Sequence, residues 1–256
     1  MPRLHVAVAV GALGLAACAG PPAPVLYPLG VDDATVAAGG DRAAAAQLLA
    51  QAVAAKGGRD RLMDLRSVHA TGAVHIATGA ATLDGTFARW FELPDRARLD
   101  VTVGAQTVTV VIAGDEVWQR RGDRAAPVDG AAADALVDSL WRDRDALLVH
   151  ALAPATVVRA VGTETVAGVA CDVITIERGD GRVGARVLLD QATYLIARVA
   201  PLGDDADDVE DDGDYRVVDG LALAHRIVTA GPTGRTELVV EAVTLDAPIA
   251  DEVFAP

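Results

Sequence analysis

The sequence predicts a mainly β fold of the α+β class, a curved antiparallel half-barrel with helices on one side. Three observations carry this prediction. Apolar and polar residues alternate through residues 82–120, and successive side chains on a strand point to opposite faces. The breaks between the alternating runs are short enough for hairpins, as at Gly104-Ala105 and Gly114-Asp115. A stretch with helical spacing, residues 129–153, separates two sets of such strands.

Residues 1–17 have the features of a lipoprotein signal peptide. Arg3 gives a positive start, and residues 6–15 form an apolar run too short to remain as a membrane-spanning helix. The run leads into Leu15-Ala16-Ala17-Cys18, which resembles the lipobox of bacterial lipoproteins. That resemblance implies cleavage before Cys18, a diacylglycerol on its sulfur and an acylated amine. An ordinary secretory signal and a chance apolar start are the alternatives.

Residues 18–40 predict a flexible tether, and residues 41–256 predict one domain. The tether is rich in proline and has no usable periodicity. Ala19 follows Cys18 and favours the outer membrane, because Asp at this place retains enterobacterial lipoproteins in the inner membrane. In the domain, Asp41 predicts the N-cap of a helix over residues 42–56 that Gly57 and Gly58 end. A shorter helix is expected around residues 59–65.

The first strands are predicted over residues 67–77 and through the 82–120 meander. Their apolar positions share one face, and the predicted wall of that face includes Leu83, Phe87, Phe91, Leu99, Val101 and Val110. His69 and His75 fall on the opposite face, about 20 Å apart, too far to bind one metal ion. We interpret them as solvated strand histidines.

Arg89 lies on the apolar parity of its strand, with Phe87 and Phe91. A bulge or a snorkelling guanidinium would return it to water. The alternative is a guanidinium at the mouth of an apolar cavity that holds the polar head of a ligand.

The second half begins with one helix over residues 129–153, whose apolar face includes Leu136, Leu140, Trp141, Leu147 and Leu148. Further strands are predicted at 156–165, 169–178, 182–190, 193–200, 214–219, 221–230 and 234–245, for roughly eleven strands in all. The tryptophans, including Trp118 and Trp90, are more typical of a core or a rim than of a ligand platform.

The acidic run Asp204–Asp214 predicts a solvated, mobile loop. A calcium loop is the weaker alternative, because Asp219 stands where the bidentate Glu is expected. The formal charge is −14, with 36 acidic and 22 basic residues, so a nucleic-acid partner is not expected.

Motifs of enzymatic chemistry are not found in the sequence. The two serines, Ser67 and Ser139, lie outside any Gly-x-Ser-x-Gly elbow, and no zinc or phosphate-binding motif is present. Carboxylates such as Asp115, Glu116 and Asp190 have no base paired with a nucleophile. Cys171 lies in a strand-like run and is expected to be a buried, inert thiol. We therefore expect no enzyme, no cofactor and no metal.

Several segments together resemble the LolA/LolB superfamily of periplasmic lipoprotein carriers and receptors. The matching pieces include residues 54–62, 65–72, 91–99 and the Gly-x-x-x-Trp hairpin Gly114–Trp118. Residues 189–195, 214–221 and 248–256 match in the same order. The soluble carriers commonly have Arg before the Pro that follows the second strand, but Leu93 precedes Pro94 here. That gating Arg is therefore not carried over to this sequence.

The resemblance implies helices that form a lid over an apolar cavity able to accept acyl chains. It leads us to expect a lipid-anchored carrier or binding protein at the outer membrane, facing the periplasm, for acyl chains or lipoproteins. The alternative is a structural or assembly module of the envelope with a filled core and an envelope-protein partner. The candidate cavity residues are Leu83, Phe87, Arg89, Phe91, Leu99, Val101, Val110, Trp118, Leu140 and Trp141, and the lipidation residue is Cys18.

Overall fold

The computed structural model describes residues 41–79, 81–203, 209–232 and 234–255. The signal peptide, the lipidated Cys18 and the tether predicted from the sequence lie outside the described residues. The described chain begins with helix α3 (Arg42–Lys56), and two backbone N–H groups donate to the Asp41 carboxylate that caps it. Gly57, with φ of 137°, ends the helix. Both predictions for this helix are confirmed, and α4 (Arg59–Asp64) follows as expected.

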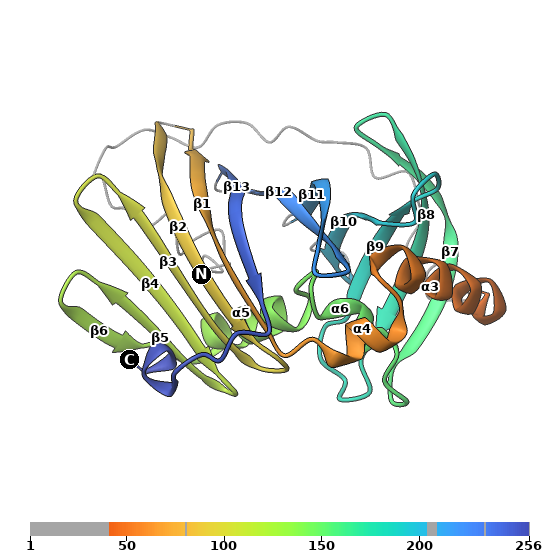
Figure 1. The fold of residues 1–256 in the computed structure, drawn as a ribbon, viewed down its shortest axis with the longest axis horizontal. Helices are drawn as coiled ribbons and strands as arrows, with labels where there is room; N and C mark the ends of the chain where they lie inside the picture. Colours follow the sequence, from red (N-terminus) through yellow and green to blue (C-terminus); the bar gives the residue numbers. More distant parts are fainter. Residues whose placement is uncertain (1–40, 80, 204–208, 233, 256) are drawn as a thin grey trace.

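Within these ranges, one antiparallel sheet of 13 strands forms the body of the molecule and curves around the helices (Figure 1). Its strand order is β6-β5-β4-β3-β2-β1-β13-β12-β11-β10-β9-β8-β7. The strands are β1 (Ser67–Ala77), β2 (Thr82–Glu92), β3 (Arg96–Val103), β4 (Gln106–Ala113), β5 (Glu116–Arg121), β6 (Arg124–Pro127), β7 (Val157–Val166), β8 (Val169–Glu177), β9 (Ala185–Asp190), β10 (Ile196–Pro201), β11 (Val209–Val218), β12 (Leu221–Gly231) and β13 (Gly234–Leu245).

The two halves of the chain build the two halves of this sheet. Strands β1–β6 lie on one side and β7–β13 on the other, and the pairing of β1 with β13 joins them. The backbone amide of Asp246 continues this pairing by donating to the Ser67 carbonyl. The predicted curved antiparallel half-barrel is confirmed, and the expected number of strands was too low by two.

The connection between the halves corrects one prediction. In place of a single helix over residues 129–153, the chain forms α5 (Ala131–Trp141) and α6 (Leu147–Ala151), joined by a turn over residues 142–146. Figure 1 places both helices beneath the sheet. We call residues 131–151 the lid.

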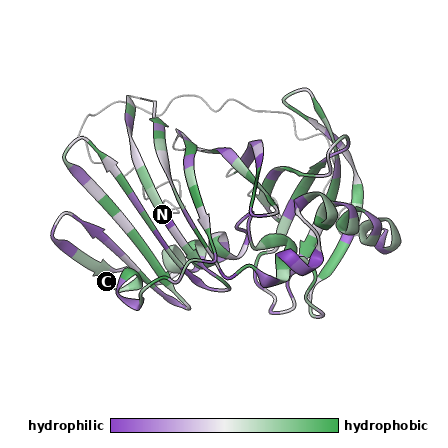
Figure 2. Cartoon of the chain, in the orientation of Figure 1, coloured by the Kyte–Doolittle hydropathy of each residue, from purple (hydrophilic) through white to green (hydrophobic). Residues whose placement is uncertain are grey.

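The acidic run is the second correction. Residues 204–208 lie outside the described residues, but residues 209–214 belong to strand β11, and residues 209–213 pair with β12. Residues 209–213 do not form the solvated loop that the charge density predicts, and the Asp212 side chain is 0% exposed, whereas Asp214 is exposed. The purple segments of β11 in Figure 2 therefore lie within the sheet.

Helices and sheet share a core on one face, which we call the inner face. Residues of α3, α4 and α6 pack there against β1, β2, β8 and β9; the largest side chains include Leu62, Phe91, Leu147, Leu148, Ile174 and Ile176. On the opposite, outer face, the short helix η1 (Asp251–Phe254) lies against β3 and β4. The Arg96 guanidinium covers the Phe254 ring there at 4.3 Å. Across the described residues, no helix has both the length and the apolar character needed to cross a membrane.

Candidate functional site

The inner face of β1–β4 carries most of the predicted cavity wall. Ladder pairing puts Leu83 opposite Ile76, Phe87 opposite Val101, and Leu99 opposite Val110. Phe87 and Val101 belong to one buried cluster with residues of β12 and β13, and Leu83 and Leu99 pack against it half-buried. The alternation in the sequence therefore placed these residues on the correct face.

The lid covers part of this wall. Leu136 of α5 packs on Val110, Ile112 and Val117. Phe91 is 0% exposed and lies in the core formed with α6, so it is a structural residue beneath the lid. Leu140 contacts both clusters. Trp141 is half-buried; its ring stacks on His150 at 5.1 Å and lies under the Arg178 guanidinium at 4.6 Å. These lid residues fill space at the inner face.

Trp118 is the predicted wall residue that the structure places elsewhere. It pairs with Val111, whereas its neighbour Val117 pairs with Ile112 and packs on the lid. Trp118 therefore lies on the outer face. The reason is the register of the β4–β5 hairpin, because a shift of one residue exchanges the two faces of a strand.

The outer face of the sheet also corrects the interpretation of His69 as a solvated residue. Strand pairing puts His69 opposite Trp90, and Trp90 opposite Arg98. The His69 ring stacks on Trp90 at 4.8 Å, and its Nε2 is buried without a hydrogen-bond partner in the described part of the chain. His69 is thus not solvated, whereas His75 is exposed and contacts Asp84 at 2.6 Å.

Arg89 is on the inner face, as its parity indicates, and its guanidinium contacts the lid. Its Nη1 donates to Oδ2 of Asp145 at 3.0 Å and its Nη2 donates to Oδ2 of Asp143 at 2.5 Å. From α3, the Lys56 ammonium reaches Oδ1 of the same Asp145 at 3.3 Å. Lys56 is buried, and its charge is compensated by this carboxylate. The polar atoms of Arg89 are therefore bound to the chain's own turn.

Arg144, between the two aspartates, is directed to the other half of the sheet. Its Nη2 lies 2.8 Å from Oε2 of Glu210, and its Nε donates to Oδ1 of Asp212 at 2.9 Å. Both carboxylates are on β11. We call Asp143, Arg144 and Asp145 the charged turn. It joins α3, β2 and β11 across the interior by ion pairs that are mostly buried, with Glu210 the most exposed member at 26%.

Burial and neighbouring charge act in opposite directions on these groups. Burial alone would raise the pKa of Asp145, but Lys56, Arg89 and Arg144 together hold it below its ordinary range. For Asp212, burial dominates and raises the pKa of its carboxyl well above the ordinary value, despite the attraction of Arg144. Its Oδ2 has no hydrogen-bond partner among the described residues. A buried carboxyl with an unpaired oxygen is costly to keep ionised.

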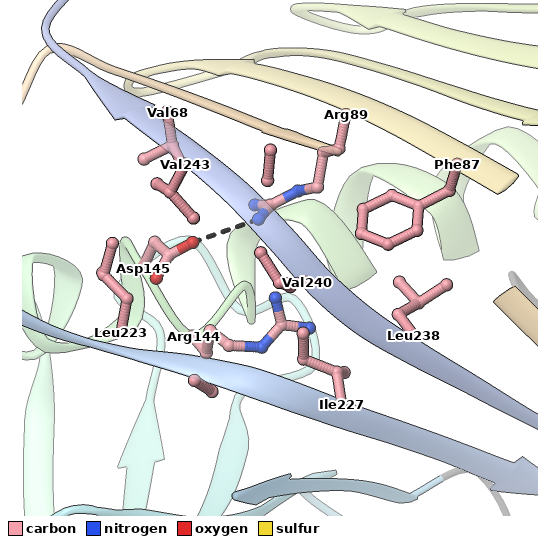
Figure 3. Close-up of a pocket in the computed structure, with 12 residues that line it drawn as sticks. Val68, Phe87, Arg89, Arg144, Asp145, Leu223, Ile227, Leu238, Val240 and Val243 are labelled. Atoms are coloured by element: carbon pink, nitrogen blue, oxygen red, sulfur yellow. Dashed lines mark hydrogen bonds and ion pairs between the residues drawn. The ribbon is translucent and has the colours of Figure 1, made fainter. Parts of the chain in front are cut away.

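A small cavity lies beside the charged turn (Figure 3). Arg89, Arg144 and Asp145 border it, and its other walls are apolar: Val68, Ala70, Phe87, Leu223, Ala224, Ile227, Leu238, Val240 and Val243. Its volume is about 20 Å³, room for about one water molecule. An acyl chain does not fit in this cavity while the lid has its present position.

Sequence reasoning missed Lys56, Arg144, Asp145 and Asp212 as site residues. The available signals were weak: a sole lysine just before a helix end, and Asp143-Arg144-Asp145 between two apolar helical stretches. Charged residues in a run normally indicate a solvated surface. No group of three or more histidine, cysteine or acidic side chains within the described ranges could hold a metal ion.

Comparisons with known proteins give matches at the level of structure. No protein-family model and no curated protein sequence matches this chain. A DUF1329 family protein from Desulfovibrio piger has a TM-score of 0.59 and 14% identity over 82% of this chain and 97% of that chain. For a putative outer membrane lipoprotein-sorting protein domain from Vibrio parahaemolyticus, the TM-score is 0.56 and the identity 11%, over 84% and 97% of the two chains.

The third structure is a LolA superfamily protein from Nitrosomonas europaea, with a TM-score of 0.56 and 12% identity over 83% of this chain and 97% of that chain. Each solved chain is covered almost completely, and more than four fifths of this chain is matched. At these identities the likeness concerns architecture rather than individual side chains. The expectation drawn from the sequence pieces is confirmed at that level: this chain has a LolA/LolB-like fold.

Proposed function

We propose that this chain is a non-enzymatic, lipid-anchored protein that carries or receives an acyl chain, either of a lipid or of a lipoprotein. The proposed occupant lies along the inner face of β1–β4, β12 and β13 after the lid has moved away. LolA-like architecture in solved lipoprotein-sorting domains supports the proposal.

The observation that carries the proposal is that the lid contacts the body of the protein in two ways. It packs on an apolar wall of the sheet, and its charged turn forms ion pairs. Beneath the lid the sheet presents an apolar wall, with Leu83, Leu99, Val103 and Leu238 half-buried beyond the central cluster. The turn that holds the lid, however, is attached through five ion pairs to described residues of the body. Buried ion pairs contribute little net stability compared with apolar packing, because desolvation offsets most of their attraction. The charged turn therefore adds little to the apolar packing of Leu147 and Leu148, and a ligand that replaces this packing can displace the lid.

The energy for this displacement comes from the ligand. Burial of an acyl chain is favourable by about 0.8 kcal/mol for each CH₂ group. A 16-carbon chain therefore has enough apolar surface to offset the loss of the lid's contacts. The small present cavity corresponds to the closed state in this proposal.

We also propose that Cys18 is the anchor, that residues 18–40 are the tether, and that the domain faces the periplasm from the outer membrane. Three acyl chains at one residue are sufficient for stable attachment. Mass spectrometry of the intact protein from a Gram-negative host would detect a triacylated mature N-terminus at Cys18. A mature protein with an unmodified N-terminus would contradict the anchor.

Lipid loading of delipidated protein, followed by native mass spectrometry, tests the carrier. We expect uptake by the unaltered chain and at least a tenfold loss in Phe87→Asp, which puts a carboxylate on the inner wall. Thr86→Asp is the matched control, because Thr86 is the adjacent, exposed residue on the outer face. Equal uptake by both variants, or none by the unaltered chain, would contradict the proposed cavity.

A second function, a structural or assembly module of the envelope, is favoured by a different observation. Ala146, Leu147 and Leu148 are at most 2% exposed and already fill the interior against the sheet. In that case the lid is permanent core and the partner is another envelope protein. A disulfide or crosslink that fixes the lid to the sheet would then leave function intact, whereas it would abolish acyl-chain uptake in a carrier.

A further inference from the structure

We propose that the charged side chains around the charged turn recognise a zwitterionic lipid head. Such a head carries an anionic group and a primary ammonium, as in an ethanolamine phospholipid. This inference rests on the proposed function and names the class of ligand. It follows from the pattern of charges that the lid now occupies.

The receiving groups on the body of the protein form two pairs of opposite sign. Lys56 and Arg89 form a basic pair, and Glu210 and Asp212 form an acidic pair. The basic pair receives Asp143 and Asp145 at 2.5–3.3 Å. Arg144, the residue between the aspartates, fills the acidic pair at 2.8–2.9 Å. The charged turn, with its order of anion, cation and anion, thus occupies a site that has both a basic pair and an acidic pair.

Displacement of the lid uncovers both pairs at once. A ligand that brings only an anion compensates Lys56 and Arg89, but it leaves the Glu210 carboxylate without its cation and the buried Asp212 carboxyl without its N–H donor. Uncompensated charge in a water-poor site is strongly unfavourable. A ligand with both signs brings an anion to the basic pair and an N–H donor to the acidic pair, so the site selects against purely anionic heads.

The type of cation follows from the acceptors. Glu210 and Asp212 now receive N–H donors from Arg144, and Oδ2 of the fully buried Asp212 is still without a donor from any described residue. A primary ammonium has three N–H donors, enough to reach both carboxyl groups. A quaternary ammonium has none. The site therefore distinguishes ethanolamine from choline heads, although both have the same net charge.

An apolar wall next to the charged side chains can receive the acyl chain of the ligand. Arg89, Arg144 and Asp145 border the cavity on one side, and Phe87, Leu238 and Ile227 line it further along the sheet (Figure 3). A head bound at the two charge pairs would direct its chain along this wall. An amphiphile matches this arrangement, since charged groups and apolar wall meet at one cavity.

Vesicles of three phospholipids with identical oleoyl chains test the proposal on the delipidated full chain. Native mass spectrometry measures the bound fraction for phosphatidylethanolamine, phosphatidylglycerol and phosphatidylcholine. We expect phosphatidylethanolamine to bind at least tenfold better than the other two. Glu210→Gln, at a residue on the rim of the network, should reduce this preference. Glu237→Gln, on β13 in an exposed pair with Arg226, should preserve it.

The outcomes separate this inference from the proposed function. Equal binding of the three lipids would overturn head recognition and leave the acyl-chain carrier intact. Preference for phosphatidylglycerol would overturn it as well, because the acidic pair would then play no part. Absence of binding for all three lipids would overturn the carrier itself. The lipid preference of the unaltered chain distinguishes these outcomes, so the test does not depend on whether a variant folds.

Discussion

The guanidinium of Arg89 and the carboxylate of Asp145 form a buried ion pair, with Nη1 3.0 Å from Oδ2. It joins the second strand of the sheet to the turn between the lid helices, 56 residues later in the chain. The pair belongs to the network of the charged turn, which borders the apolar wall of the inner face. The position of the lid is therefore coupled to the sheet by these polar atoms as well as by the apolar contacts of Leu136, Leu147 and Leu148.

Asp145→Asn should destabilise the protein by about 3–5 kcal/mol, because Lys56 and Arg89 would lose their shared carboxylate while remaining buried. Urea unfolding followed by circular dichroism measures the change in the free energy of unfolding. Arg226→Met is the control, since Arg226 forms a half-exposed pair with Glu237. Exposed pairs contribute about 0–1 kcal/mol. Equal changes in the free energy of unfolding for the two variants would show that the buried pair contributes no more to stability than the half-exposed pair.

Asp212→Asn should change how stability depends on pH. The pKa of Asp212 is raised in the folded state, so its contribution to stability is complete below the ordinary carboxyl pKa, near 4, and is lost as pH rises toward the raised value. Asparagine can still accept the hydrogen bond from Arg144 and does not ionise. The variant should therefore become more stable than the unaltered protein as pH increases.

Thermal unfolding of both proteins between pH 5 and 8 measures this difference. Each pH unit contributes up to about 1.4 kcal/mol for one proton. Asp145, whose pKa is lowered, acts with the opposite sign: its contribution is present above pH 4 and is lost only at more acidic pH. Parallel pH profiles of the unaltered protein and Asp212→Asn would contradict the assignment for Asp212.

Leu147→Ala should cost about 2–5 kcal/mol, because Leu147 is fully buried between α6 and the sheet. The same substitution leaves a space between α6 and the sheet. In a carrier it should weaken the lid more than the sheet, so amide hydrogen exchange should increase first in residues 131–151. Exchange that increases uniformly over the sheet would indicate that the lid is an inseparable part of the core.

Gly72→Ala tests the junction between the two halves of the sheet. A Cβ at Gly72 would lie 2.0 Å from the carbonyl oxygen of Val239, so the backbone of β1 or β13 would have to shift. We expect a loss of about 1–3 kcal/mol in the free energy of unfolding. Gly213→Ala is the control, since a Cβ added there would meet no atom of the described residues within 4 Å. Comparable effects of both would show that the junction tolerates the shift.

The sequence was informative where one local rule acted alone. Asp41 and Gly57 set the ends of α3, and alternation placed Phe87, Leu99 and Val101 on the inner face. The rule failed at Trp118, because a hairpin register cannot be read from alternation when Val117 and Trp118 are both apolar. It failed also at β11, where pairing with β12 and the charge of Arg144 hold Asp212 in the interior.

The charged turn was unpredictable for the same reason. Arg89, Asp145 and Asp212 are far apart in the chain, and their charges are compensated only after the sheet has closed around the lid. Local composition describes such residues as solvated. Their burial depends on contacts that no short window of sequence contains.

The pairing of β1 with β13 has a consequence for how the protein matures. Strands that are first and last in the domain must meet, so the long-range contact that unites the sheet cannot form until synthesis and export have delivered residue 245. Without β13, the edges of β1 and β12 that face it in the sheet have no partner strand. A ribosome or translocon that stalls near the end of the message would release a product with unprotected strands.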